Sequence, residues 1–184
     1  MKTAIYAACG LLFACAAAQA QTAAAPAPLP PVAADPQSTS ASYGDWVLRC
    51  QRLGEPGKER RICEIAQTIQ VQGQQTVLAQ VAMGRVQPGD PMRLTVVVPS
   101  NISLPGFVRI FADDKQAEGF DLAWRRCTPG GCFADAEIKD DMVLKMRART
   151  DKGRLQFKDS TGRDIALPFS LRGLAQALDA LAKP

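Results

Sequence analysis

The chain has 184 residues, of which 47% are hydrophobic, and its 22 Lys and Arg against 18 Asp and Glu give a formal net charge of +4. This composition suffices for a globular core, and so small a positive excess does not indicate a nucleic-acid partner. The sequence contains no histidine, which excludes Ser–His and Cys–His nucleophile pairs, histidine general bases and histidine metal ligands.

Residues 1–20 have the features of a secretory signal peptide. Lys2 precedes an uncharged apolar run, and Ala18-Gln19-Ala20 supplies the small-x-small pattern that a signal peptidase cleaves. The run is too short to span a bilayer comfortably and no stop-transfer segment follows, so we expect no transmembrane segment. The pattern predicts export to the periplasm or cell envelope. An alternative is a lipobox-like reading of residues 12–15, in which Cys15 would carry a lipid anchor.

Residues 21–42 are rich in proline and alanine and carry one charge, which predicts a disordered linker. Residues 43–184 are long enough for a single domain with its own core.

Four cysteines remain after removal of the signal: Cys50, Cys63, Cys127 and Cys132. An even number in an exported chain predicts disulfides, and pairing of nearest neighbours demands least of the fold. The spacings suit neither a zinc site nor a C-x-x-C redox site. Within CTPGGC, Pro129 and Gly130 suit the centre of a type II turn that sets the flanking cysteines opposite each other.

Apolar residues alternate with polar ones over residues 43–50, 61–72, 77–83 and 92–98, which is typical of half-buried antiparallel strands. Further strands are expected near residues 107–112 and 118–124, and residues 155–169 predict a hairpin. Trp124 and Cys127 fall on opposite phases of the alternation, which predicts a bulge near Arg125 and Arg126, or early divergence of the next strand.

Two helices complete the pattern. Residues 138–149 predict a short internal helix with acids early and bases late. Residues 170–184 predict an amphipathic helix with Ser170 as its N-cap and a leucine stripe on one face. The predicted fold is all-β, an antiparallel β-sandwich of eight or nine strands with a short internal helix and a C-terminal amphipathic helix.

No catalytic motif, cofactor loop or metal-ligand pattern is found, so we expect a protein that is not an enzyme. A run of cations that begins in the second half of the predicted internal helix is a candidate basic binding surface for an acidic partner, an acidic polysaccharide or phosphate-bearing lipid. It comprises Lys145, Arg147, Arg149, Lys152, Arg154 and Lys158. Residues 53–61, inside the first cysteine pair, are a second basic candidate. A solvated surface is the alternative for both.

Several motifs together resemble the invasion-associated locus B family of Gram-negative bacteria. They are YGDWVLRC, the following Cys63 and Gln67, RLTVVVP, LPGFVRIFADD, RCTPGGCFADAEI and SLRGLAQAL. The resemblance spans nearly all of residues 43–181 and implies a small, disulfide-bonded β-sandwich of the periplasm or envelope with no known catalytic activity. The matched positions, among them Trp46 and Gly173, are structural in type.

These observations favour a non-catalytic envelope protein that acts by binding an unidentified partner, with host-cell interaction or invasion as one setting. A periplasmic structural or stress factor, such as a holdase or inhibitor, is the alternative. Two enzymatic hypotheses remain: a hydrolase that uses carboxylates alone, and a thiol oxidoreductase at Cys127 and Cys132.

Overall fold

The computed structural model describes residues 37–183 apart from residues 56, 72, 74, 75, 88 and 114–118. The expected signal peptide, the alternative lipid-anchor site at Cys15 and most of the expected linker lie outside the described residues. The strands are β1 (Ser38–Tyr43), β2 (Trp46–Leu53), β3 (Arg60–Gln70), β4 (Val77–Gly84), β5 (Arg93–Val98), β6 (Phe107–Phe111), β7 (Phe120–Thr128), β8 (Gly131–Glu137), β9 (Lys152–Lys158) and β10 (Asp164–Ser170), and the helices are α1 (Asp140–Arg147) and α2 (Leu174–Leu181).

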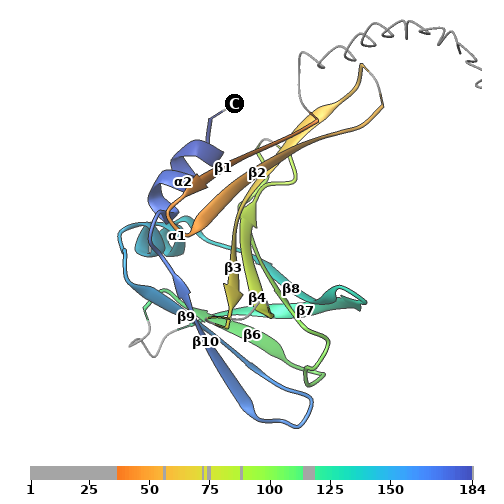
Figure 1. Ribbon diagram of the computed structural model, residues 1–184, viewed down its shortest axis with the longest axis vertical. Helices are drawn as coiled ribbons and strands as arrows, with labels where there is room; N and C mark the ends of the chain where they lie inside the picture. The colour runs from red at the N-terminus through yellow and green to blue at the C-terminus, as the bar shows by residue number, and fades with distance from the viewer. Residues whose placement is uncertain are drawn as a thin grey trace, which may run out of the picture. The chain divides into compact units, whose positions relative to one another are not determined.

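The strands form one antiparallel sheet in the order β1-β2-β3-β4-β5-β8-β7-β6-β9-β10. The sheet folds over, with β6, β9 and β10 crossing β3 and β4 steeply (Figure 1). Its far end returns to β3, where the Gln67 amide receives the Ser170 backbone N–H at 2.7 Å and donates to the Ser170 carbonyl at 3.3 Å. The two parts of the sheet face each other across the core as the layers of a sandwich do, which confirms the predicted all-β fold with its two helices.

The core lies between these layers and under α2. Most of its largest fully buried side chains come from the strands, among them Trp46, Ile65, Met83, Leu94, Leu122 and Leu155, and others come from the C-terminal part of the chain and from α1: Leu171, Leu174 and Met146. Full burial of each such side chain contributes roughly 1.5–3 kcal/mol. Neither helix in the described part of the chain is long and apolar enough to cross a membrane.

The folded domain begins earlier than the sequence indicates. Residues 38–42, expected in the disordered linker, form most of β1, which pairs with β2 from Ser38↔Gln51 to Tyr43↔Trp46. Five of its six residues are exposed, so the strand has no apolar alternation that could reveal it. Backbone hydrogen bonds to β2 hold it in place.

The predicted bulge is present. The register between β7 and β8 shifts between Trp124 and Arg126, so that Arg125 is the extra residue. This shift lets Trp124 pair with Ala134 while Cys127 pairs with Cys132, and it resolves the phase conflict that the alternation of residues 120–127 poses.

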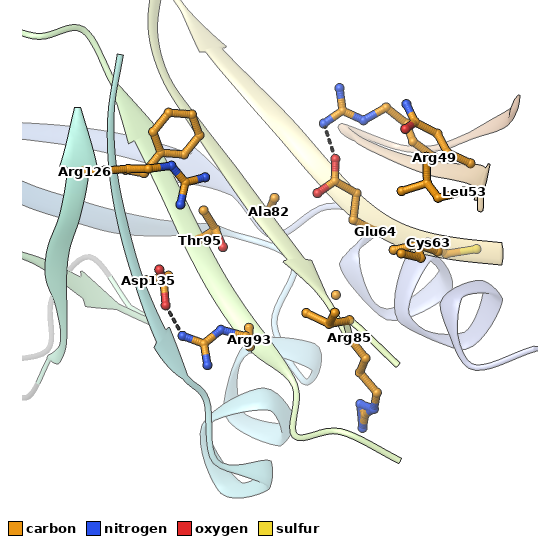
Figure 2. Close-up of a pocket in the computed structure, with 15 residues that line it drawn as sticks. Arg49, Leu53, Cys63, Glu64, Ala82, Arg85, Arg93, Thr95, Arg126 and Asp135 are labelled. Atoms are coloured by element: carbon orange, nitrogen blue, oxygen red, sulfur yellow. Dashed lines mark hydrogen bonds and ion pairs between the residues drawn. The ribbon is translucent and has the colours of Figure 1, made fainter. Parts of the chain in front are cut away.

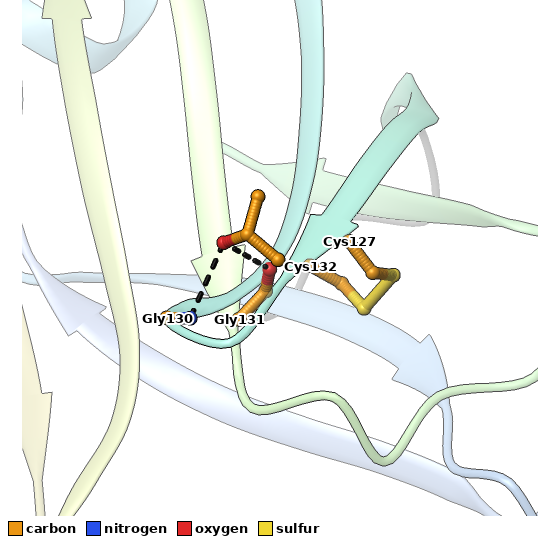
Figure 3. Close-up of a disulfide and its surroundings, with 5 residues drawn as sticks. Cys127, Gly130, Gly131 and Cys132 are labelled. Carbon is orange, nitrogen blue, oxygen red and sulfur yellow. Dashed lines mark hydrogen bonds between the residues drawn. A yellow bond between two sulfur atoms is a disulfide. The ribbon is translucent and has the colours of Figure 1, made fainter.

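Both predicted disulfides form between directly opposed residues of neighbouring strands, Cys50–Cys63 across β2 and β3, and Cys127–Cys132 across β7 and β8. The turn between the second pair differs from the type II turn expected from its sequence, because the positive φ (128°) falls at Gly131 and not at Gly130. A Cβ at Gly131 would lie 2.5 Å from the Val98 carbonyl oxygen of the adjacent strand β5. The Thr128 hydroxyl accepts the Gly130 backbone N–H at 3.2 Å and closes the turn (Figure 3).

We expect the double substitution Cys127→Ser/Cys132→Ser to lower the free energy of unfolding by roughly 2 kcal/mol, because it releases a short closed loop in the unfolded chain. Urea unfolding of the oxidised wild type and of the variant measures the difference. A variant as stable as the wild type would show that the paired strands alone fix this hairpin.

The C-terminal helix begins later than expected. Ser170 lies in β10 and does not cap α2; its hydroxyl accepts the Arg172 backbone N–H at 3.1 Å. The N-cap of α2 is Gly173, with φ 88°. The predicted leucine stripe is present in α2, where Leu174 and Leu178 are buried. Leu171, expected in the same stripe, lies before the helix. Strand pairing extends through Ser170 and delays the helix start.

Candidate binding surface

A groove of about 480 Å³ crosses the solvent face of the sheet, opposite the core. One wall is formed by β2 and β3 with Arg49, Leu53 and Ile62, and the other by β7 and β8 with Arg126 and Phe133. Each wall is a pair of strands joined by a disulfide. The alternation of β-strands places these residues outward while their neighbours fill the core.

Small side chains form the floor of the groove. Ala82 of β4 and Thr95 of β5 lie between the longer side chains of the walls (Figure 2). Gly84 of β4 also lines the groove. Gly84 has no room for a side chain, because a Cβ there would lie 2.9 Å from the Cys63 carbonyl oxygen. The low floor between two stiff walls gives the groove its depth.

Arginines outnumber carboxylates in the lining. The four arginines are Arg49, Arg85, Arg93 and Arg126, and the carboxylates are Glu64 and Asp135. Both carboxylates are already in ion pairs: Arg49 Nη2 lies 2.8 Å from Glu64 Oε1, and Arg93 donates to Asp135 (Figure 2). These carboxylates hold two arginines in position and are not free to bind a cation.

The other two arginines are available for a ligand. The Arg126 guanidinium stacks over the Phe133 ring at 4.6 Å, which orients it without neutralising its charge. Arg85, which follows β4, is exposed and has no carboxylate partner among the described residues. A groove with net positive charge and planar guanidinium groups can hold carboxylate, sulfate or phosphate groups through paired hydrogen bonds.

The basic surface predicted from the sequence has a smaller net positive charge in the fold than its run of Lys and Arg indicates, because carboxylates lie beside several of these cations. Lys145 and Arg147 project from α1 and face Asp141 and Asp179 at 3.9 and 2.6 Å. Arg149 pairs with Asp113 at 3.0 Å and with Asp151 at 2.7 Å.

The remaining three candidates, Lys152, Arg154 and Lys158, lie on one face of β9. Arg154 stacks over the Phe111 ring at 4.2 Å, and Lys158 pairs with Asp164 at 2.9 Å. The structure thus brings three of the six together, and carboxylates pair with four of the six, two of these carboxylates (Asp113 and Asp179) coming from distant segments.

Sequence reasoning missed the groove because its four arginines come from four separate segments of the chain. Only the alternation of outward positions on β2, β5 and β7 could have indicated that Arg49, Arg93 and Arg126 share a face, and that requires knowledge of the strand order. The second basic candidate, residues 53–61, contributes Leu53 to the groove, and its Arg60 and Arg61 lie nearby. The described residues contain no cluster of three side chains suited to a metal ion.

Residues 46–182 match the family model of the invasion associated locus B (IalB) protein. The chain belongs to this family. Two invasion protein B homologs of Brucella abortus, from strain 2308 and from biovar 1 strain 9-941, are each 27% identical to it over 176 residues, which is 95% of this chain and 94% of the homolog. The resemblance seen in the sequence motifs is therefore confirmed.

The fold also matches a member of known structure. The crystal structure of invasion associated protein B from Bartonella henselae aligns with a TM-score of 0.65 at 21% identity, covering 78% of this chain and 94% of that one. The invasion associated locus B motifs are structural in this chain: Trp46 is fully buried, the four cysteines form the two disulfides, and Gln67 joins β3 to β10.

Proposed function

We propose that this invasion associated locus B protein is exported to the periplasm or cell envelope and acts without catalysis, by binding an acidic partner in the arginine groove. The observation that carries the proposal is the groove itself, in which four arginines face two carboxylates that are already paired. Two disulfides support the export, because such bonds persist in oxidising compartments.

The walls of the groove favour an extended acidic segment as its occupant. Arg49 and Arg126 lie on opposite walls, and apolar side chains at Leu53, Ile62 and Phe133 lie beside them. Leu53 is 48% exposed, so a bound segment would gain apolar contact as well as ion pairs. Two disulfide-linked walls are pre-formed, which lowers the entropy lost on binding.

The expected result is that Arg49→Gln/Arg126→Gln weakens binding of poly-L-glutamate by at least tenfold and reduces the salt dependence of the affinity, because the Arg126 guanidinium is lost and the Glu64 carboxylate is left without Arg49 in the groove. Titration by isothermal calorimetry at 50 and 200 mM salt measures both effects.

The matched control is Lys145→Gln/Lys152→Gln, which removes the same charge from the basic surface predicted from the sequence. It is expected to bind as the wild type does. If the control loses binding while the groove variant keeps it, the binding surface is the one around α1 and β9. Equal binding by all three proteins would refute both surfaces.

The names of the Brucella and Bartonella relatives favour host-cell entry as the setting in which the groove acts. In a strain that lacks the protein, the groove variant is then expected to restore host-cell entry less well than the wild type. Envelope defects with normal entry would favour the alternative of a periplasmic structural or stress factor. The exposed pair Leu104 (61%) and Phe107 (48%) would suit that role, since holdases bind unfolded chains through apolar surface.

A further inference from the structure

A second concavity, of about 700 Å³, lies where β3 begins, β4 ends and α2 terminates. It meets the arginine groove along a shared rim formed by Cys63, Arg85 and Val86. Arg60 and Arg61 line the second pocket alone, and Arg49 and Arg126 line the groove alone. The two sites can therefore be separated by substitution.

The floor of this pocket is apolar. It is formed by Met92, which precedes β5, and by Leu178 and Leu181 of α2, with Val86 at the rim. Val86 is 52% exposed, and Met92 and Leu181 are half-buried. The apolar stripe of α2 is thus left partly uncovered at its C-terminal end, where burial by a ligand would gain roughly 25 cal/mol for each Å².

The rim is basic. Arg60, Arg61 and Arg85 are all exposed, and none has a carboxylate partner among the described residues. No Asp or Glu is among the residues that line the pocket. Asp90, in the loop beside it, has its carboxylate engaged by the Gln87 backbone N–H at 3.0 Å. Three arginines beside an apolar floor create a positive potential where an apolar ligand would enter.

The surrounding backbone offers little to a peptide. β3 and β4 are interior strands of the sheet, each with a neighbour on both sides, so their hydrogen-bonding edges are already used. Peptides that bind by adding a strand to a sheet need such an edge, so this mode of peptide binding is excluded at the pocket. The pocket offers apolar surface and cations, and its volume falls in the range of small-molecule sites.

We propose that this pocket binds an anionic amphiphile: an acyl chain lies against Met92, Leu178 and Leu181, and its carboxylate or phosphate head is held by Arg60, Arg61 and Arg85. Guanidinium groups suit both head groups because they donate paired hydrogen bonds to two oxygens at once. The site is distinct from the groove, because Arg60, Arg61 and the apolar floor belong to the pocket alone and only the rim with Arg85 is shared.

The test uses the purified protein and 11-(dansylamino)undecanoic acid, whose fluorescence rises in an apolar site. The wild type is expected to bind the probe, and Arg60→Gln/Arg61→Gln to bind it at least tenfold more weakly. Arg49→Gln/Arg126→Gln, the variant of the groove, is the matched control and is expected to keep wild-type affinity. A second variant, Leu181→Asn, makes the floor of the pocket more polar. It is expected to bind the probe more weakly, while its circular dichroism spectrum matches that of the wild type.

Competitors identify the ligand class. Displacement by laurate indicates a free amphiphile, and displacement by phosphatidylglycerol vesicles but not by vesicles of phosphatidylcholine indicates a lipid of an anionic bilayer. Either result supports the proposal. Displacement by inorganic phosphate alone, displacement by poly-L-glutamate without displacement by laurate, or equal probe affinity in the wild type and Arg60→Gln/Arg61→Gln would overturn it. Loss of the groove's polyglutamate binding would leave this result unchanged.

Discussion

Replacing Gly173 by alanine is expected to lower the free energy of unfolding by about 3 kcal/mol, the sum of a strained backbone and a steric clash. Gly173 has φ 88°, where an L side chain is strained. An added Cβ would also overlap the Tyr43 carbonyl oxygen and lie 2.9 Å from the Gly44 Cα atom. All of these neighbours are backbone, which cannot move aside as a flexible side chain can.

The matched control is Gly162→Ala, in the turn between β9 and β10. Gly162 has nearly the same φ, 82°, but a Cβ there would meet nothing within 4 Å. We expect this control to lower the free energy of unfolding by about 1 kcal/mol, the contribution of the backbone strain alone. Urea unfolding of both variants separates the two contributions, and equal losses would show that the close approach at Gly173 relaxes freely.

This close approach joins the two ends of the domain. Gly44, in the β1–β2 turn, has φ 57°, and a Cβ on it would lie 2.7 Å from the Arg172 carbonyl oxygen. That same oxygen accepts the Asp45 backbone N–H at 3.1 Å. The two glycines are 129 positions apart in the chain, and a Cβ on either one would clash with the backbone around the other. Both positions therefore need glycine.

An ion pair accompanies the backbone contact. Arg172 Nη2 lies 2.6 Å from Asp45 Oδ1 and Nε 3.1 Å from Oδ2. Hydrogen bonds from Arg172, and after it from Ser170, lower the pKa of the Asp45 carboxyl below its ordinary value. Because the Arg172 side chain is 70% exposed, the pair stabilises the fold less than the backbone contact does.

How far the sequence predicts the fold depends on whether a feature has a local pattern. The alternation of apolar residues predicts the paired strands, and the conflict between Trp124 and Cys127 predicts the bulge that the structure places at Arg125. β1 has no such pattern, because nearly all of its side chains are exposed. Backbone hydrogen bonds to β2 hold this strand in the sheet. Ser170 satisfies the rule for an N-cap, but pairing of β10 with β9 and the contact at Gly173 set the helix start.

The candidate site depends on long-range arrangement even more. The run of cations from Lys145 to Lys158 is prominent in the sequence, yet Asp113, Asp164 and Asp179 pair with members of it in the fold. The arginines of the groove are scattered in sequence, and only the strand order brings them together. The net charge of a surface depends on which residues are neighbours in space, and a run of cations in the sequence does not show which carboxylates will lie beside it.

Gln67 is the side chain that closes the folded sheet. It is 6% exposed, accepts the Ser170 backbone N–H at 2.7 Å, and donates to the carbonyl oxygens of Asp45 at 3.2 Å and Ser170 at 3.3 Å. Gln67→Leu keeps the approximate volume but removes the hydrogen bonds of Gln67 to the Ser170 N–H and to the Asp45 carbonyl oxygen. We expect it to lower the free energy of unfolding by about 2–4 kcal/mol. Gln80→Leu, on the neighbouring strand β4, is the control and should change stability by less than about 0.5 kcal/mol.

The Ser170 carbonyl oxygen has a second donor, the Trp46 indole N–H at 3.0 Å. Trp46→Phe removes this donor, and either single variant leaves the oxygen with the other one. The double variant leaves it with neither, so its loss of stability should exceed the sum of the single losses by about 1 kcal/mol. A double-mutant cycle by urea unfolding measures this excess. Simple additivity would show that another donor satisfies the oxygen, and that Gln67 closes the sheet through the Ser170 N–H and the Asp45 carbonyl instead.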